Sequence, residues 1–444
     1  MKKISLILCI VLLFSALTCL SGCDSKSEAL VYLLNFKPES ARVYQAVAAD
    51  YEKETGIPVK VVTAAANTYE QTLKSEIAKT SAPTIFQLNG PIGYNSWKDY
   101  CMDLKDTKFY SLLSDKDLAI KDGEGVYGVP YVVEGYGIIY NNAIMKKYFA
   151  LPDKKVNIDS AEDIKNFTTL KAVVEDMTAK KDALGIKGVF ASTSLTGGED
   201  WRWQTHLANV PLYYEFSENT DYTDPTLAGL NTDDIAFKYA ENYKNLFDLY
   251  LNNSITQRGL LGSKSVADSM AEFALSQVAM VQNGNWAWSQ IADVQGNTVK
   301  SEDIKFLPLY IGMPGEEKQG LCIGTESYFA VNRNASEEAK TQSLDFLYWL
   351  FSSETGKEYV TDELGFLTPF NSFSEEEQPE DPLGREMIEW MNKDGVNTVP
   401  WIFTSFPGER FKTTFGGVLL EYAQGTKDFA AVSDTVKNTW KQER

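Results

Sequence analysis

The amino-acid sequence predicts an α/β protein of more than one domain. Three short apolar runs, at 29–36, 57–64 and 84–88, alternate with two segments of helical spacing, which gives the order β-α-β-α-β. Strands joined by helices in this way form a parallel sheet with right-handed crossovers. The chain has 444 residues. At roughly 100–200 residues per domain, this length suggests two or three domains.

The first two helices are predicted from their apolar spacing and their end signals. Apolar side chains recur at helical spacing between 40 and 55, and Gly56 follows as a stop signal. Thr68 and Gln71 match a capping box, which predicts a second helix that reaches Lys79.

The rest of the chain continues the alternation of helices and strands. Two extended runs are expected within 126–140, broken at Gly135 and Gly137, and residues 192–235 are expected to be irregular. Further strands are predicted at 185–191 and 328–331, helices at 161–181, 237–251, 337–351 (capped by Ser336), 411–423 and 426–440, and additional elements at 273–281 and 305–309.

A glycine-rich segment at 123–128 matches the pattern GxGxxG. A dinucleotide site needs a strand before this motif and a helix after it. Here Asp122 precedes the segment and Val129-Pro130 begin an extended run. We therefore expect a turn.

The charge and the rare residue types exclude several classes of function. The chain has 61 Asp and Glu against 42 Lys and Arg, and an acidic surface repels nucleic acid and anionic lipid. His206 is the only histidine, which excludes a histidine-based metal cage and limits a Ser-His-Asp triad to that residue. We expect no metal, no cofactor and no catalytic residue. Whether Cys101 and Cys322 pair is left open.

The N-terminus has the pattern of a secretory leader. Lys2 and Lys3 precede an apolar run at 4–20, and Leu20-Ser21-Gly22-Cys23 resembles the bacterial lipobox. That resemblance implies a signal peptide at 1–22, a diacylglyceryl group on Cys23, a tether at 23–28, and anchoring outside the cytoplasm by lipid alone. The alternative is an N-terminal membrane anchor, because the run is long enough at the lower limit.

Two loops are predicted at the carboxyl ends of the first sheet, where ligands bind in open α/β folds. Asn35 and Lys37 follow the first strand, and Asn89 and Gly90 follow the third. Glu134 lies in an apolar run, so its carboxylate must either form a structural salt bridge or face a cleft and accept sugar hydroxyls. Both interpretations remain open.

Aromatic residues indicate a sugar site. Trp201 and Trp203 form one W-x-W pair, and Trp286 and Trp288 form another, each beside polar residues. Indole faces bind the apolar faces of pyranose rings, although core packing accounts for most tryptophans. We expect one tryptophan of each pair in a site.

Several segments together are similar to a known family. They are the lipobox, 35–39, 82–86 with Asn89-Gly90, 131–141, 283–288 and 411–425. In order and spacing they resemble the family 1 extracellular solute-binding proteins of bacterial ABC importers, the group that includes maltose-binding protein. The resemblance implies a type II fold with two lobes, each a mostly parallel sheet flanked by helices, a hinge between them, and sugar bound in the gap. It also implies an N-terminal lobe of 29–140 plus about 309–360 and a C-terminal lobe of 141–308 plus about 361–444.

The resemblance implies roles for individual residues. Glu134 matches a sugar-contacting glutamate of the family, Trp286 matches a stacking tryptophan, and Glu326 lies in a hinge-side loop. With the strand-end loops included, the predicted ligand-binding set is Asn35, Lys37, Asn89, Gly90, Glu134, Asp200, Trp201, Trp203, Trp286, Glu326, Trp401 and Glu409.

The predicted function is capture of a neutral sugar, an oligosaccharide, by a monomeric lipoprotein that delivers it to an ABC permease. One alternative is an exported glycoside hydrolase that uses Glu134 with Asp200 or Glu326 as its carboxylate pair. Another is the same fold with a ligand that is not a sugar.

Overall fold

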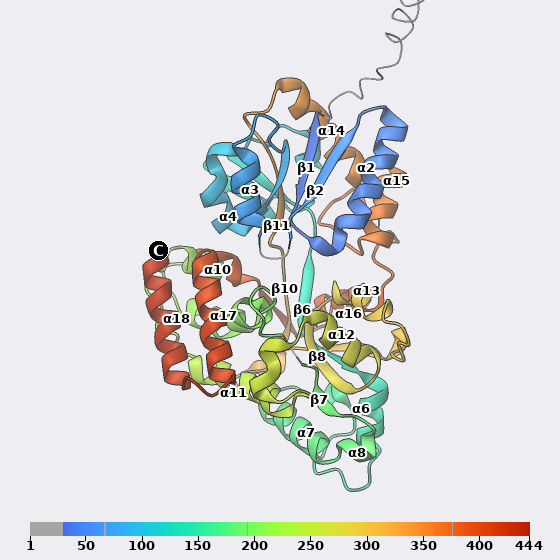
Figure 1. The fold of residues 1–444 in the computed structure, drawn as a ribbon, viewed down its shortest axis with the longest axis vertical. Helices are drawn as coiled ribbons and strands as arrows, with labels where there is room; N and C mark the ends of the chain where they lie inside the picture. Colours follow the sequence, from blue (N-terminus) through green and yellow to red (C-terminus); the bar gives the residue numbers. More distant parts are fainter. Residues whose placement is uncertain (1–29, 66–67, 193, 375) are drawn as a thin grey trace, which may run out of the picture.

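A computed structural model shows two lobes joined by chain segments that pass between them (Figure 1). It describes residues 30–65, 68–192, 194–374 and 376–444. The expected signal peptide at 1–22, the lipidation of Cys23 and the tether at 23–28 lie outside these residues. In the described ranges, no helix combines the length and apolar character needed to cross a membrane.

The N-terminal lobe is built on a six-stranded sheet of order β2-β1-β3-β11-β5-β4. Its strands are β1 (Val31–Asn35), β2 (Val59–Thr63), β3 (Ile85–Asn89), β4 (Ile120–Asp122), β5 (Gly125–Pro130) and β11 (Ser327–Val331). Its helices are α2 (Ala41–Thr55), α3 (Tyr69–Ile77), α4 (Gly90–Trp97), α5 (Lys108–Ser111), α14 (Glu337–Ser352) and α15 (Glu354–Glu358). Successive β1 residues point to opposite faces, so Leu33 packs with α2 and α14 whereas Leu34 packs with α3.

The C-terminal lobe has a second sheet of order β12-β10-β6-β8-β7, with β9 paired to β6. Its strands are β6 (Glu134–Asn141), β7 (Gly188–Phe190), β8 (Val278–Gly284), β9 (Ile304–Leu307), β10 (Gln319–Gly324) and β12 (Asn397–Pro400). Its helices are α6 (Asn142–Phe149), α7 (Phe167–Ala179), α8 (Lys181–Leu184), α9 (Ala208–Ser217), α10 (Pro225–Leu230), α11 (Ala240–Asn253), α12 (Val266–Ala274), α13 (Ala287–Ala292), α16 (Pro382–Met391), α17 (Glu409–Ala423) and α18 (Phe429–Glu443).

Short helical turns lie between these elements. The 3₁₀ turns are η1 (Pro38–Ser40), η2 (Lys98–Tyr100), η3 (Lys116–Leu118), η4 (Ala161–Asp163), η6 (Arg258–Ser263), η7 (Ser301–Asp303), η8 (Glu316–Lys318) and η10 (Ile402–Ser405), and the π-helical turns are η5 (Arg202–Leu207) and η9 (Tyr359–Glu363).

Both sheets are mixed rather than mostly parallel. In the N-terminal sheet β1 pairs in parallel with β2 and β3, but β11 is antiparallel to both β3 and β5. In the C-terminal sheet β6 is antiparallel to β8, β9 and β10. Two adjacent parallel strands need a crossover connection between them. A strand that enters the sheet from the other lobe has no such connection and can pair antiparallel to its neighbours.

The chain changes sheet after β5, after β10 and again before α16. Tyr131 and Val132 still pack in the N-terminal core, whereas β6 belongs to the C-terminal sheet. Phe370 bridges Leu113 of the N-terminal lobe, and α16 packs on β9 and β10. These changes differ from the expected boundaries at 140, 309 and 360, because an apolar run identifies a strand but not the sheet that it joins.

Local signals explain several element ends. Gly56 ends α2 in the left-handed region with φ 76°, and the Ser336 hydroxyl accepts the Ala339 amide at the start of α14. Thr68 lies at the N-cap of α3 without a side-chain cap, so the expected capping box does not form. Gly123 and Glu124 form the turn between β4 and β5, which confirms the expected turn.

Other local predictions were wrong. Gly135 and Gly137 do not break β6; an added Cβ at Gly137 would lie 2.4 Å from the Leu307 carbonyl oxygen, so the glycine permits close strand approach. Much of the segment expected to be irregular, 192–235, is helical in η5, α9 and α10. The pairing of Cys101 and Cys322, which the sequence left open, does not occur, and both thiols are buried and free.

Candidate functional site

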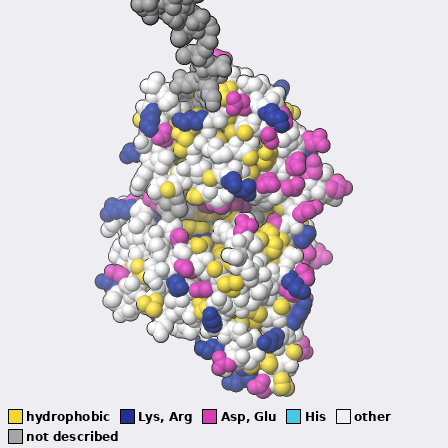
Figure 2. Space-filling model, turned by 45° about the vertical axis from the view of Figure 1, so that its right-hand side comes forward, with side chains coloured by type: hydrophobic (Ala, Val, Ile, Leu, Met, Phe, Trp, Pro, Cys, Tyr) yellow, Lys and Arg dark blue, Asp and Glu magenta, His cyan; other side chains and the backbone are white. Residues whose placement is uncertain are grey.

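A cavity of about 350 Å³ lies between the lobes and is lined by both. Figure 2 shows the hollow between the upper and lower halves, with acidic and apolar side chains beside it. The N-terminal lobe contributes the loop after β1, the start of α3 and the end of β3. The C-terminal lobe contributes η5, the start of α13 at Trp286 and the first turn of α17. Pockets between domains are common positions for small-molecule sites.

A buried ion pair lies at the cavity wall. The Lys37 ammonium is 2.8 Å from both carboxylate oxygens of Glu134, and both residues line the cavity. Burial raises the pKa of the Glu134 carboxyl, and the charge of Lys37 opposes that rise. Burial lowers the pKa of the Lys37 ammonium, but attraction to Glu134, Glu39 and Glu326 outweighs it and raises the pKa. The structure therefore contains the salt bridge and also places its carboxylate at the cavity.

Asn35 is placed behind the cavity rather than on it. Its side-chain amide donates to the Lys37 carbonyl and to the hydroxyls of Ser40 and Thr63. The side chain is fully buried and shapes the loop that presents Lys37. The structure thus gives Asn35 a supporting position, because its buried amide is occupied by bonds within the lobe.

Asn89 lines the cavity, whereas its neighbour Gly90 does not. Gly90 has φ 63°, and its amide donates to the Glu326 carbonyl at 2.8 Å. A Cβ added at Gly90 would lie 2.8 Å from the Thr404 Cβ of η10. Gly90 is therefore a contact point between the lobes. The Glu326 side chain lines the cavity, and burial raises the pKa of its carboxyl against the charges of Lys37 and Lys412.

An aromatic floor covers the C-terminal side of the cavity. We define it as the four lining rings Trp201, His206, Trp286 and Phe403. The indoles of Trp201 and Trp286 lie 5.9 Å apart between centroids with an interplanar angle of 48°. Trp401 is buried and packs edge-on against Trp286 at 6.3 Å, so it supports the floor without lining the cavity.

Trp203 and Asp200 are not brought to the cavity. Trp203 is buried in the lobe core, where its indole packs on Phe247 and Tyr250. The pair Trp201 and Trp203 lies on helical backbone, and side chains two residues apart on a helix diverge. Asp200 is buried against α17 and accepts the Gly198 amide.

Trp288 also lies off the cavity, so one tryptophan of each pair lies on it.

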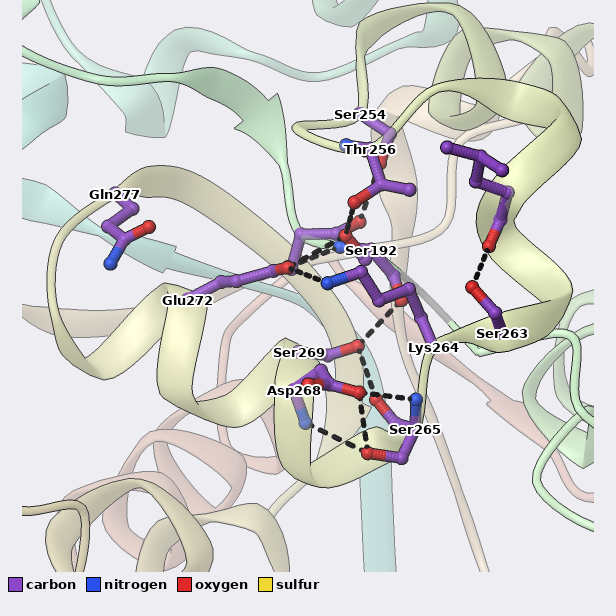
Figure 3. A network of polar contacts seen from close by, with 12 residues as sticks. Ser192, Ser254, Thr256, Ser263, Lys264, Ser265, Asp268, Ser269, Glu272 and Gln277 are labelled. Carbon is purple, nitrogen blue, oxygen red and sulfur yellow. Dashed lines mark hydrogen bonds and ion pairs between the residues drawn. The ribbon is translucent and has the colours of Figure 1, made fainter.

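A polar network joins Ser192, upstream of Trp201 in the chain, to helix α12 (Figure 3). The amide and hydroxyl of Ser192 donate to the Glu272 carboxylate at 2.7 and 2.8 Å, and the Ser269 hydroxyl donates to the Ser192 carbonyl. The Val266 amide donates to the Glu199 carboxylate at 2.7 Å. These bonds hold Ser192 and Glu199, both upstream of Trp201, against α12.

Sequence reasoning missed several lining residues. Arg202 stacks on Trp201 with its guanidinium carbon 3.9 Å from the ring centroid, and burial lowers its pKa to about 9. The π-helical turn η5 brings Arg202 and His206 to the same cavity, and no sequence signal identifies such a turn. The other missed residues include Glu70, Glu199, Phe403 and Lys412.

Glu409, in contrast, was in the expected set and lines the cavity.

The cavity can bind a polar ring compound through flat faces and oriented carboxylates. Within the described residues, no group of three or more His, Cys, Asp or Glu side chains is arranged to hold a metal ion. Aromatic faces and convergent polar groups of this kind define a small-molecule binding site.

Comparison with known proteins identifies the class. The family model described as bacterial extracellular solute-binding protein matches residues 46–383, and the chain belongs to that family. The predicted solute-binding family is thereby confirmed. No curated protein matches the chain in sequence.

Solved structures show the same two-lobed fold. One is a chitin oligosaccharide binding protein, at 16% identity and a TM-score of 0.72, with 93% of this chain and 98% of that chain covered. Another is the solute-binding protein RafE in complex with raffinose, at 19% identity and a TM-score of 0.69, with 93% and 99% covered. A third is a sugar transporter from Bacillus licheniformis in complex with stachyose, at 18% identity and a TM-score of 0.63, with 93% and 100% covered. These likenesses confirm the predicted two-lobed α/β fold.

Proposed function

We propose that this protein captures an uncharged oligosaccharide outside the cytoplasm and delivers it to the permease of an ABC importer. The observation that carries the proposal is the pair of lining indoles, Trp201 and Trp286, set at an angle beside the carboxylates of Glu134 and Glu326. Indoles stack on sugar ring faces, while carboxylates accept hydroxyl hydrogens.

The ligands of similar structures support the same class. Raffinose, stachyose and chitin oligosaccharide are named for proteins that share the fold. A cavity lined from two lobes also suits capture by hinge closure, in which sugar docks on one lobe and the other covers it.

The proposed site comprises cavity-lining residues from both lobes. Its expected members are Lys37, Asn89, Glu134, Trp201, Trp286, Glu326 and Glu409. The protein acts as a monomer, binds without catalysis, and is held at the membrane by a lipid on Cys23.

A thermal-shift screen tests the proposal. Purified protein is heated with raffinose, stachyose, maltose, chitin oligosaccharide and, for comparison, spermidine and a tripeptide. We expect a higher melting temperature with at least one sugar, followed by a micromolar dissociation constant in calorimetry, which corresponds to about −8 kcal/mol. A shift with spermidine or the peptide alone would replace the sugar with another solute.

A second assay separates binding from hydrolysis. The protein is incubated for a day with the sugar that gives the largest shift, and reducing ends are then measured. Intact sugar is expected. Released reducing ends would establish a glycoside hydrolase.

A further inference from the structure

His206, the only histidine of the chain, lies at the centre of the aromatic floor. Its imidazole stacks face to face on Tyr136, with ring centroids 4.0 Å apart and an interplanar angle of 5°. Four further rings lie around the imidazole at centroid distances of 4.7–5.8 Å. They are those of Trp201, Phe403, Trp286 and Trp401. The ring is therefore held in one orientation by its neighbours.

This fixed imidazole has polar atoms without a protein partner. The backbone carbonyl of His206 accepts the Tyr136 hydroxyl at 3.2 Å. Neither ring nitrogen of His206 hydrogen-bonds to any residue in the described ranges. The residue lines a cavity that a ligand could fill, so a ligand group could supply the missing partner.

The surroundings keep the imidazole uncharged. Burial lowers the pKa of His206 well below its ordinary value, and the positive charges of Arg202, Lys37 and Lys412 lower it further. A neutral imidazole has one N–H donor and one acceptor nitrogen. It can therefore form a hydrogen bond with either a donor or an acceptor group of a ligand.

We propose that His206 is a specificity-determining residue whose imidazole hydrogen-bonds to a hydroxyl of the bound ligand at the aromatic floor. The inference rests on the proposed function, because it assigns a ligand group within that same cavity. The cavity wall carries Lys37, Arg202 and Lys412 as well as several carboxylates. Such a wall offers both hydrogen-bond donors and acceptors, which suits a ligand that carries hydroxyl groups.

The single histidine makes a direct measurement possible. Protein purified without a histidine tag and labelled with ¹⁵N-histidine gives the two nitrogen resonances of one imidazole. The probe is the sugar of the screen that gives the largest thermal shift. We expect at least one ring nitrogen to shift on saturation with this sugar, and His206→Phe to weaken its affinity on the order of tenfold.

His206→Phe retains a flat ring for stacking on Tyr136 but removes both nitrogens, so its melting temperature without ligand shows whether the floor is intact. Unchanged nitrogen resonances in wild-type protein that binds sugar, or unchanged affinity in a folded His206→Phe variant, would overturn the inference and leave the proposed function standing. Absence of sugar binding in wild-type protein would remove the proposed function and the inference together.

Discussion

The Lys37 ammonium lies 2.8 Å from both carboxylate oxygens of Glu134, in a pair that is buried at the cavity. The pair joins the loop after β1 to the first residue of β6, and so connects the N-terminal lobe with the C-terminal sheet. The carboxylates of Glu39 and Glu326 act on the same ammonium. Because charges this deep are poorly hydrated, neither partner tolerates loss of the other.

We expect Glu134→Gln to lower the free energy of unfolding by about 3 kcal/mol, since it leaves Lys37 buried without its partner. The double variant with Lys37→Met should recover part of this loss, because no buried ammonium remains. Urea unfolding at pH 7 of the wild type, both single variants and the double variant measures the coupling. Strictly additive losses would show that the two side chains do not depend on each other.

Trp286→Ala should weaken sugar binding by about 2 kcal/mol, roughly thirtyfold, because it removes one stacking face from the cavity. Trp288→Ala is the matched control, since Trp288 lies two residues further along, is also partly buried, and packs against the lobe core away from the cavity. Calorimetry with the sugar that gives the largest thermal shift compares the two. Equal losses in both variants would remove Trp286 from the site.

Cys23→Ser should release the protein from the membrane. The wild-type chain, expressed in a bacterium that processes lipoproteins, is expected to partition into the detergent phase of a Triton X-114 extraction, whereas the variant partitions into water. Mass spectrometry of the wild-type N-terminus should show a lipid on Cys23. A wild-type chain that retains residues 1–22 and no lipid would favour the membrane-anchor alternative.

The first part of the fold could be predicted because its signals are local. The apolar spacing before Gly56 and the runs that become β1, β2 and β3 depend only on neighbouring residues. Sheet membership depends on pairing between distant segments. The pairing of Gly137 in β6 with Asn283 in β8 is one such case, and it moves β6 into the C-terminal sheet.

Part of the candidate site could also be predicted, because the signals for some of its residues are local. Trp286 and Glu134 carried family resemblance in their own segments, and both line the cavity. Trp201 and Trp203 were both candidates, and residues two apart share a face only in a strand. This segment is helical, so only Trp201 lines the cavity. His206 was considered only as a possible metal or triad residue. Its position depends on Tyr136, which is distant in sequence.

Acid should destabilise the fold through His206. The pKa of His206 is well below its ordinary value in the folded protein, whereas an unfolded histidine has a pKa near about 6.5. Below that pH the unfolded chain binds a proton that the folded chain does not, so stability falls as the pH drops from about 6.5 toward the folded pKa. The slope from this group reaches at most about 1.4 kcal/mol per pH unit.

Denaturant unfolding of the wild type and His206→Phe across this pH range isolates the contribution. The difference in unfolding free energy should stay constant above pH 7, and the wild type should lose stability relative to His206→Phe as the pH falls, because only the wild type carries the imidazole. Parallel pH profiles for the two proteins would contradict a depressed pKa for His206.

Gly90→Ala should destabilise the contact between the lobes. Gly90 has φ 63°, and the added Cβ would lie 2.8 Å from the Thr404 Cβ of the opposite lobe. Gly56→Ala is the matched control, because Gly56 has φ 76° but no atom within 4 Å of an added Cβ. Both variants carry the left-handed backbone strain of about 1–2 kcal/mol, and only Gly90→Ala adds the clash.

Small-angle scattering should therefore show a larger radius of gyration for Gly90→Ala than for Gly56→Ala. Thr404→Gly in the Gly90→Ala background should reverse that increase, and a failure to reverse it would mean that the two residues do not limit lobe closure.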